Sequence, residues 1–381
     1  DIDNQPRVLP MEIGADEFSA NAFDLAVLSF ISPSTTIPKT AGTSEPVTVR
    51  IRNNGTTTIS SLNLNYTVNG GTPVTQTFSA LSIPPCGETN LTFTTNITYA
   101  AGGSNTIMVY NGLINGSNAD ANNTNDTLRQ NFCTTYSGNF TINKNAPLSA
   151  TNFQSFNAVI NALYSCGISG PVRFTVASGS GPYNERLVMN GVVPGSSATN
   201  TITFNGNTTK ETITFDAISS TDAATVKLNA VKYVTLRNLT INATNATIGA
   251  IGVLLTNNSV TTTPADTNTI TNCVINIPNY VSSINMCGIC AMLNNSSVTT
   301  STGNYANRTI IDSNIIRGGY YGVLLAGNSV FPNYAKRNVL SNNRCFNQFY
   351  MGLYPIYQDS MTIFRNTVDS MSITLSLIHI S

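Results

Sequence analysis

The chain has 381 residues, of which 41% are apolar but only 9% are charged, and its 18 basic and 18 acidic residues cancel. Such a length allows two or three domains. The absence of a basic stripe argues against nucleic-acid binding, and the absence of an apolar run of about 18 residues argues against a membrane-spanning segment. Polarity carried by Thr, Asn and Ser, with few Glu and Lys, favours an all-β fold.

The two ends of the chain predict that it is an internal piece of a longer protein. Residues 1–18 carry no initiator Met and no signal peptide, and we expect them to close a preceding domain. The last seven residues, "LSLIHIS" (375–381), equal the translation of a sequencing adapter, so we expect them to be foreign to the protein. They contain His379, the single histidine. Without it, a histidine-based triad or histidine–metal site lacks its essential residue.

Residues 24–131 alternate apolar and polar positions in short runs such as "DLAVLSFI", "PVTVRIRNN" and "TNLTFTTNI". Turn signals such as "NNG", "NGG" and "PPCGE" separate the runs. This spacing is typical of a seven-stranded sandwich, and we predict an immunoglobulin-like domain over residues 19–135.

One helix is expected, over residues 152–165. The stretch "NFQSFNAVINALYSCG" places apolar side chains on one helical face, and Gly167 ends the pattern. The face consists of Phe153, Phe156, Val159, Ile160 and Leu163.

A repeated phrase follows the helix. "GVLLTNNSV" (252–260) returns as "GICAMLNNSSV" (288–298) and "GVLLAGNSV" (322–330), so that glycines recur at 252, 288, 322 and 352. Intervals of 36, 34 and 30 residues are those of a solenoid. Two short strand blocks per repeat, with loops of variable length, predict a right-handed parallel β-helix over residues 136–374, the helix capping its first coil.

The second block, "TLRN", "TITN", "IIDS", "VLSN" and "IFRN", predicts which side chains stack. Its last residues predict a ladder of amides and hydroxyls: Asn238, Asn272, Ser313, Asn342 and Asn366. The position two before is always apolar, ending with Leu340 and Phe364. The position three after is apolar up to Cys345, and Asp369 breaks the series.

The cysteines favour packing over chemistry. Cys287 and Cys290 form a CxxC, but they occupy slots that hold Ile, Tyr, Met and Leu in other repeats, and Cys345 falls in an isoleucine series. Cys133 and Cys166 flank the expected helix and can form a disulfide in an oxidising compartment, although sequence does not determine connectivity.

The stretch "DANNTND" admits a calcium loop or a plain turn. Asp120, Asn122, Thr124 and Asp126 alternate as oxygen ligands do, yet no glutamate follows at the required distance, which favours a turn.

Catalytic carboxylates are also not evident. The acids of the repeat region are scattered, and only Asp312 lies within a strand block, beside Thr271 and Ser341. We therefore identify no catalytic, cofactor-binding or metal-binding residue and expect no cofactor. The acids are Asp216, Asp222, Asp266, Asp312, Asp359 and Asp369.

Three segments resemble large secreted bacterial surface proteins exported by the type IX route. "IDNQPRVLPMEIGADEF" resembles the end of a β-helix domain. "DLAVLSFISP…PVTVRIRNNGTTTISSLNLNYTVNGG…NNTND" is similar to the CARDB adhesion module. "NFQSFNAVINALYSCGISGPVRFTVASGSGPYNERLVM" is similar to the start of a pectin-lyase-like β-helix. The resemblance implies an extracellular or outer-surface location.

Two functions are open. The first is a non-enzymatic surface protein, an adhesion or glycan-binding module or a structural stalk, whose partners are extracellular glycans or cell surfaces. Asn and Thr ladders and Tyr320, Tyr334 and Tyr350 are candidate sugar contacts. The alternative is a polysaccharide lyase or glycoside hydrolase whose catalytic coils are missing from this stretch.

Overall fold

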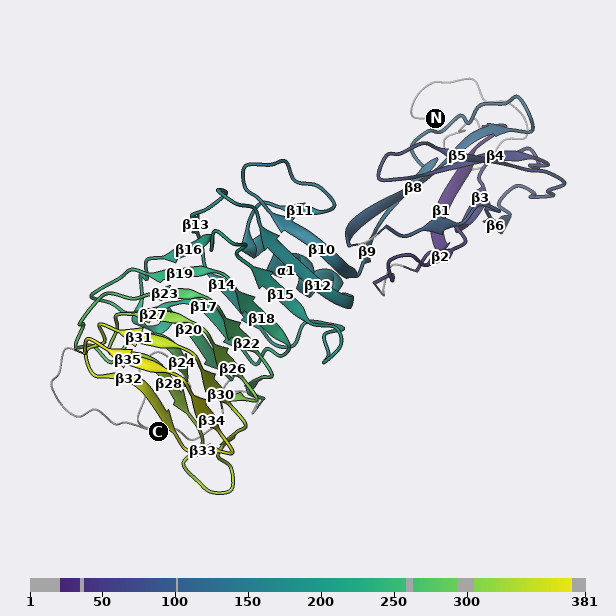
Figure 1. Ribbon diagram of the computed structural model, residues 1–381. Coiled ribbons are helices and arrows are strands. Elements are labelled where there is room, and N and C mark those ends of the chain that lie inside the picture. Colours follow the sequence, from purple (N-terminus) through teal and green to yellow (C-terminus); the bar gives the residue numbers. More distant parts are fainter. Residues whose placement is uncertain (1–20, 35–37, 101, 258–262, 293–304, 372–381) are drawn as a thin grey trace, which may run out of the picture. The chain divides into compact units, whose positions relative to one another are not determined.

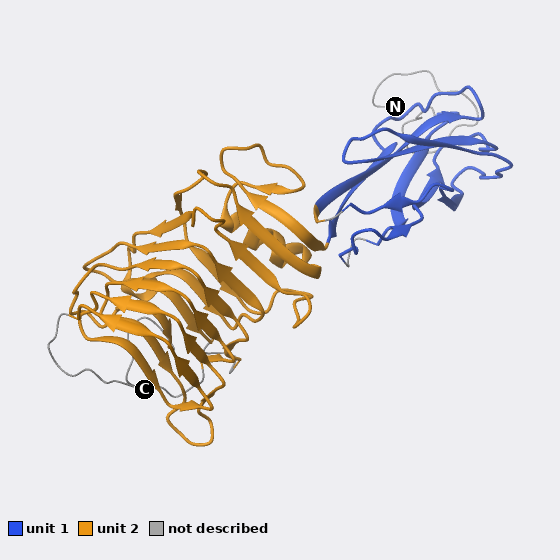
Figure 2. Cartoon of the chain, in the orientation of Figure 1, with its two compact units in different colours: residues 1–100, 104–134 blue, residues 101–103, 135–381 orange. Residues whose placement is uncertain are grey.

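The computed structural model describes residues 21–34, 38–100, 102–257, 263–292 and 305–371 (Figure 1). The segments 1–18 and 375–381, with His379, lie outside these residues. The chain divides into two compact units, and the division follows Thr134, apart from residues 101–103, which belong to the second unit (Figure 2). Strands make up nearly all regular structure in both, so the predicted all-β fold class is confirmed.

The first unit is a sandwich of antiparallel sheets. Within the described residues, one sheet has the order β1-β3-β6, the other has the order β5-β4-β8-β9, and β2 pairs with β7. The strands are β1 (Leu25–Ser32), β2 (Ser44–Glu45), β3 (Thr48–Asn53), β4 (Leu62–Val68), β5 (Val74–Phe78), β6 (Glu88–Thr92), β7 (Ile97–Thr98), β8 (Gly103–Ile114) and β9 (Thr127–Thr134).

The core of the sandwich follows from strand alternation, because every second side chain points between the sheets. Val49 and Ile51 of β3 and Leu64 of β4 are fully buried. The ring of Tyr66 meets that of Phe93 edge-on, with centroids 4.9 Å apart, which is a favourable aromatic geometry.

The second unit is a coil of parallel strands arranged in three sheets, a parallel β-helix (Figure 1). Within the described residues the first sheet contains β11 (Asn152–Phe153), β10 (Tyr136–Ile142), β12 (Ile168–Val176), β15 (Ile202–Asn205), β18 (Val234–Arg237), β22 (Thr269–Thr271), β26 (Ile310–Asp312), β30 (Val339–Ser341) and β34 (Thr362–Phe364). The second sheet contains β13 (Tyr183–Asn184), β16 (Thr212–Phe215), β19 (Thr240–Ala243), β23 (Val274–Asn276), β27 (Ile315–Arg317), β31 (Arg344–Phe346) and β35 (Thr367–Asp369).

The third sheet contains β14 (Leu187–Asn190), β17 (Ala224–Asn229), β20 (Ala250–Thr256), β24 (Met286–Ala291), β28 (Tyr321–Ala326) and β32 (Met351–Ile356). Two further parallel pairs occur in the segments that lead from a strand of the third sheet to the next strand of the first sheet. They are β21 (Ala265–Asp266) with β25 (Ala306–Asn307), and β29 (Ala335–Lys336) with β33 (Gln358–Asp359). A short 3-10 helix, Ser220–Asp222, precedes β17.

Equivalent side chains of successive coils stack into ladders. Phe140, Phe174 and Phe204 are aligned across β10, β12 and β15, and their rings stack with centroids 5.4 and 5.7 Å apart. Leu236 and Ile270 continue the same ladder in β18 and β22. All five are buried, so the sequence pattern of one apolar slot per strand produces a continuous dry core.

The expected helix is α1 (Phe156–Cys166), which begins four residues later than predicted. Asn152 and Phe153 pair with β10 instead, and the Ser155 side chain caps the helix by accepting a hydrogen bond from Ala158 N at 3.0 Å. All five residues of the predicted apolar face are buried, Phe153 from strand β11 and the other four from the helix, and Gly167, with φ of 68°, ends the helix.

The corner between the first and second sheets turns on one residue in the left-handed region. Asn238, Asn272, Ser313 and Asn342, four of the residues predicted to form the amide ladder, have φ between 51 and 57°. Asn238 and Asn272 do bond along the coil, since Asn272 Nδ2 donates to Asn238 Oδ1 at 2.8 Å.

The buried ladder, however, lies one residue later than Ser313 and Asn342, at Asn314 and Asn343, and the partly buried Asn366 continues it. Asn343 Oδ1 accepts from Asn314 N and Nδ2, both at 3.0 Å, and Asn366 Oδ1 accepts from Asn343 N at 3.0 Å and Nδ2 at 2.9 Å. The predicted alignment of the last coil was therefore wrong by one residue.

Strand pairing makes the same correction. Leu340 pairs with Ile363, not with Phe364, and Cys345 pairs with Val368, so that Asp369 does not break the apolar series.

Candidate binding face of the coil

The outer face of the first sheet carries two arginines above the apolar core. Arg173 in β12 and Arg237 in β18 are exposed, while their neighbours Phe174 and Leu236 point into the coil. Strand β15 lies between them, with Thr203 beside Arg173 and Asn205 beside Arg237. Among the described residues neither guanidinium belongs to an ion pair, so both charges are available to a ligand.

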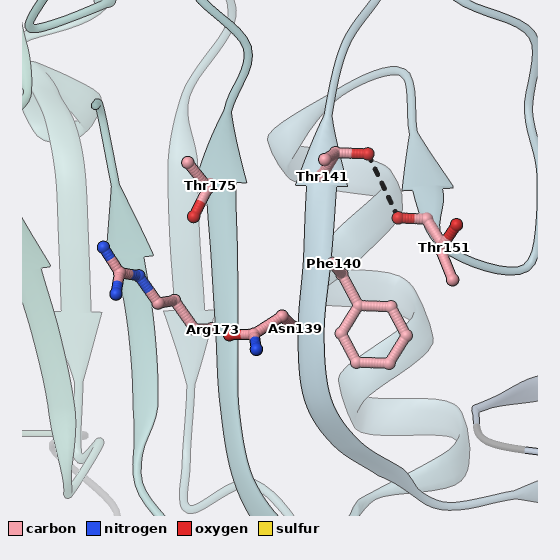
Figure 3. A pocket seen from close by; sticks show the side chains of 6 residues that line it. All are labelled: Asn139, Phe140, Thr141, Thr151, Arg173 and Thr175. Carbon is pink, nitrogen blue, oxygen red and sulfur yellow. Dashed lines mark hydrogen bonds between the residues drawn. The ribbon is translucent and has the colours of Figure 1, made fainter. Parts of the chain in front are cut away.

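A shallow depression of about 400 Å³ opens on this face at the first coils (Figure 3). It is lined by Asn139, Phe140 and Thr141 of β10, by Arg173 and Thr175 of β12, and by Thr151. The carbonyl oxygen of Thr151 accepts a 3.1 Å hydrogen bond from Thr141 Oγ1. Amides, hydroxyls and one cation there suit the hydroxyls or carboxylates of a sugar chain.

Asp312 lies farther along the same face, and its predicted neighbours Thr271 and Ser341 are confirmed by strand pairing. Its carboxylate accepts hydrogen bonds from Ser341 Oγ at 2.6 Å, Asn342 Nδ2 at 2.8 Å and Ser313 Oγ at 2.8 Å. These bonds, with Ser341 first, lower the pKa of Asp312. The group therefore stays ionised at neutral pH and ties adjacent coils together, which does not suit a general acid.

The other aspartates of the coil that the sequence singled out meet different partners. Asp222 pairs with Arg186, and the buried Asp266 pairs with Arg308. Asp369 pairs with Arg344 at 3.2 Å. Asp359 accepts a hydrogen bond from Ser360, and Asp216 is exposed. In the part of the chain that the structure describes, no three His, Cys, Asp or Glu side chains are arranged to hold a metal.

The candidate calcium loop of the sandwich is built from turns and backbone bonds. Asp120 Oδ1 accepts from Asn122 N at 2.9 Å, and its Oδ2 accepts from Leu25 N at 2.7 Å. Asn122 Oδ1 accepts from Thr124 Oγ1 at 2.7 Å. These oxygens accept hydrogen bonds from donors of the same chain, two of them over the short spans of turns.

The structure also brings Asp126 to Asp120, although the sequence separates them by six positions. Asn111 Nδ2 donates to both, at 2.8 Å to Asp120 Oδ2 and at 3.0 Å to Asp126 Oδ1. Asp126 is 7% exposed and Asp24 is close by, also buried. Burial, followed by the hydrogen bond and charge of Asp120, raises the pKa of Asp126 to about 7.

We expect this raised pKa to make the parent protein less stable as pH rises. Between about pH 4, where an unfolded aspartate titrates, and pH 7, the folded state binds the extra proton, so the free energy of unfolding falls with pH. The expected loss between pH 5 and 8 is on the order of 2 kcal/mol. Urea unfolding of the sandwich should show this slope in the parent and lose it in Asp126→Asn. Equal slopes in both proteins would contradict the assignment.

The cysteines behave as packing groups. Cys287, Cys290 and Cys345 are free and fully buried, as the sequence predicted. Burial, and secondarily a hydrogen bond with Cys287 that favours the protonated thiol, raises the pKa of Cys290 well above its ordinary value, so this thiol stays protonated at neutral pH. Cys133 and Cys166 are disulfide-bonded.

Cys287 and Cys290 lie on the outward side of the third sheet, not in the coil interior. Cys290 is aligned with Leu254, which is aligned with Lys227, a partly exposed lysine. An apolar cluster with Tyr321 and Leu324 buries them there. Sequence reasoning missed this second apolar layer, because strands β20, β24 and β28 are buried on both faces.

The three tyrosines proposed as sugar contacts do not form one site. Tyr320 and Tyr350 stack at 5.2 Å before strands β28 and β32. Tyr334 follows β28 and meets the exposed Phe331 edge-on at 5.7 Å. The signal that sequence reasoning missed is the pair Arg173 and Arg237, because the repeat alignment began only at β18.

Comparisons with known proteins add little. No family model and no curated protein matches the chain. One similar solved structure is the CARDB domain of a Pyrococcus furiosus protein, in complex with di-metal ions. The match covers 31% of this chain and all of that domain, with 20% identity and a TM-score of 0.25. A domain of a putative cell surface protein from Methanosarcina acetivorans is 26% identical over 30% of this chain and 94% of its own, with a TM-score of 0.23.

No helix of the described residues has the length and hydropathy needed to cross a bilayer.

Proposed function

We propose that the chain is a non-enzymatic protein of the extracellular space or outer cell surface, in which the coil binds glycans along the outer face of its first sheet. The observation that carries this proposal is the pair of cations, Arg173 and Arg237, which belong to no ion pair among the described residues and lie beside Thr and Asn side chains of β12, β15 and β18. An extended polymer can lie along such a face and contact several coils at once.

The domain assignment belongs to the same proposal. Residues 19–135 act as a CARDB-like immunoglobulin-type module, and residues 136–374 act as a pectin-lyase-like β-helix of a type IX secretion substrate. The all-β architecture of two units supports this arrangement. The description of one similar structure as a putative cell surface protein is in keeping with the location.

The alternative, a lyase or hydrolase, lacks support among the described residues. A glycosidase needs two carboxyl groups across the scissile bond. Among the described residues of the proposed binding face the one acid is Asp312, which three hydrogen bonds keep ionised.

We expect the protein to bind acidic polysaccharides and to leave them intact. Isothermal titration with polygalacturonate and with neutral glucans should give salt-sensitive binding of the acidic polymer, because both arginines contribute charge. Arg173→Ala with Arg237→Ala should weaken it by about tenfold, or roughly 1.4 kcal/mol. Arg317→Ala, an exposed arginine of the second sheet, is the matched control.

Two results would overturn the proposal. If Arg317→Ala weakens binding of the acidic polymer as much as the double variant does, binding does not depend on the outer face of the first sheet. Unsaturated products or new reducing ends above a heat-killed control, with or without calcium, would favour the enzyme.

A further inference from the structure

Strand β5 (Val74–Phe78) forms an open edge of the sandwich. Within the described part of the chain it is the outermost strand of its sheet and pairs with β4 alone. Because a strand alternates its backbone bonds between its two sides, half of its N–H and C=O groups point away from β4. Among the described residues no further backbone hydrogen bond reaches this strand. The Gln76 side chain anchors it, accepting from Thr94 N at 2.7 Å and from Thr94 Oγ1 at 3.0 Å.

This edge lacks the usual protection against strand pairing. Natural edge strands carry charges, internal prolines or bulges that discourage association. Residues 74–78, "VTQTF", contain neither a charge nor a proline, and their register with β4 has no irregularity. By contrast, β1 is bulged, and the outer strand β6 of the other sheet carries Glu88, paired with Arg50 at 2.6 Å.

The sequence of β5 is complementary to itself in an antiparallel arrangement. A two-fold axis at Gln76 places Thr75 opposite Thr77 of a second copy, and Val74 opposite Phe78. Thr–Thr pairs and pairs of an aromatic with a β-branched residue are the cross-strand combinations that stabilise sheets. No like charges meet, and the formal net charge of the chain is zero.

We propose that the β5 edge is a homophilic contact, through which two copies of this chain join their four-stranded sheets into one continuous sheet. Such an isologous contact is closed, so it yields dimers and not fibres. A single strand pair buries little area, and the contact is weak between free molecules. Many copies fixed to a surface gain affinity by their high effective concentration, which suits contact between two surfaces.

The test introduces charges at the exposed Thr75 and Thr77, in a Cys86→Ser background that removes the exposed free thiol. One variant combines Thr75→Lys with Thr77→Lys, and a second combines Thr75→Glu with Thr77→Glu. In the two-fold pairing, position 75 of one copy lies opposite position 77 of the other, so each variant repels itself while the two attract each other. Sedimentation equilibrium of the full chain measures the dimer directly.

We expect the parent to dimerise, each variant alone to dimerise more weakly by about tenfold or more, and an equimolar mixture of the two to recover dimers. Asn90→Lys on the β6 edge is the control and should dimerise as the parent does. A monomeric parent at the highest soluble concentration, dimerisation of the double-lysine variant equal to that of the parent, or no recovery in the mixture would each overturn the proposal.

Discussion

Replacement of Cys290 by Asp should unfold the later coils, whereas replacement by Val should be tolerated. Cys290 is fully buried between Leu254 and Leu324 of the adjacent strands. The described neighbours of Cys290 are apolar or aromatic and offer a carboxylate no cationic partner, and an uncompensated buried charge costs on the order of 3–5 kcal/mol. Val is close to Cys in volume and keeps the apolar contacts, so its effect should stay within about 1 kcal/mol.

Urea unfolding followed by circular dichroism measures both effects. The parent and Cys290→Val should unfold at similar urea concentrations, and Cys290→Asp should unfold at a much lower one. Cys290→Ser separates the causes, because it keeps the size of the side chain but removes the apolar sulfur. If Cys290→Val is as damaging as Cys290→Asp, a specific role of the thiol replaces the packing role.

The second large effect is expected at Asn343, in the middle of the buried amide ladder. Asn343→Ala removes four side-chain hydrogen bonds and leaves Asn314 N and Ile311 O without this partner inside the coil. Each buried polar group left unsatisfied costs about 1–3 kcal/mol, so the total loss should be on the order of 3 kcal/mol.

Asn342→Gly is the matched control for this prediction. Asn342 is the preceding residue, is exposed and has φ of 55°, which glycine adopts without strain. Its side chain makes one bond, to Asp312, so its loss should cost less than about 1 kcal/mol. If Asn342→Gly destabilises the protein more than Asn343→Ala, the stabilising ladder is the one predicted from the sequence, which includes Asn342.

The repeat was predictable because stacking imposes the same residue type at the same slot. The alignment of Gly252, Gly288 and Gly322 predicted the observed pairing of Ile251 with Cys287 and of Cys287 with Tyr321. It slipped by one residue in the last coil, since "IFRN" and "VLSN" end alike and Asn342 and Asn343 are adjacent. Only hydrogen bonds inside the coil distinguish the exposed amide from the buried one.

The candidate binding face was less predictable. Arg237 belongs to "TLRN", the first of the aligned blocks, but Arg173 precedes that alignment, so no repeated phrase placed the two arginines on one sheet. Asp126 and Asp120 come together because β8 and β9 place Asn111 between them, which is a tertiary arrangement. The alternation of apolar and polar residues along a strand predicts which side chains are buried, but it does not predict which polar side chains contact one another.

The corner between the first and second sheets restricts how a chain of this kind can diverge. From β18 onward only two residues separate the strands there, as at Asn238–Leu239 and Asn342–Asn343. The next corner is permissive, comprising residues 277–285 in one coil and 318–320 in the following one. Insertions and deletions during evolution should therefore accumulate at the permissive corner. At that corner a loop can change in length without changing which side chains of adjacent coils are aligned.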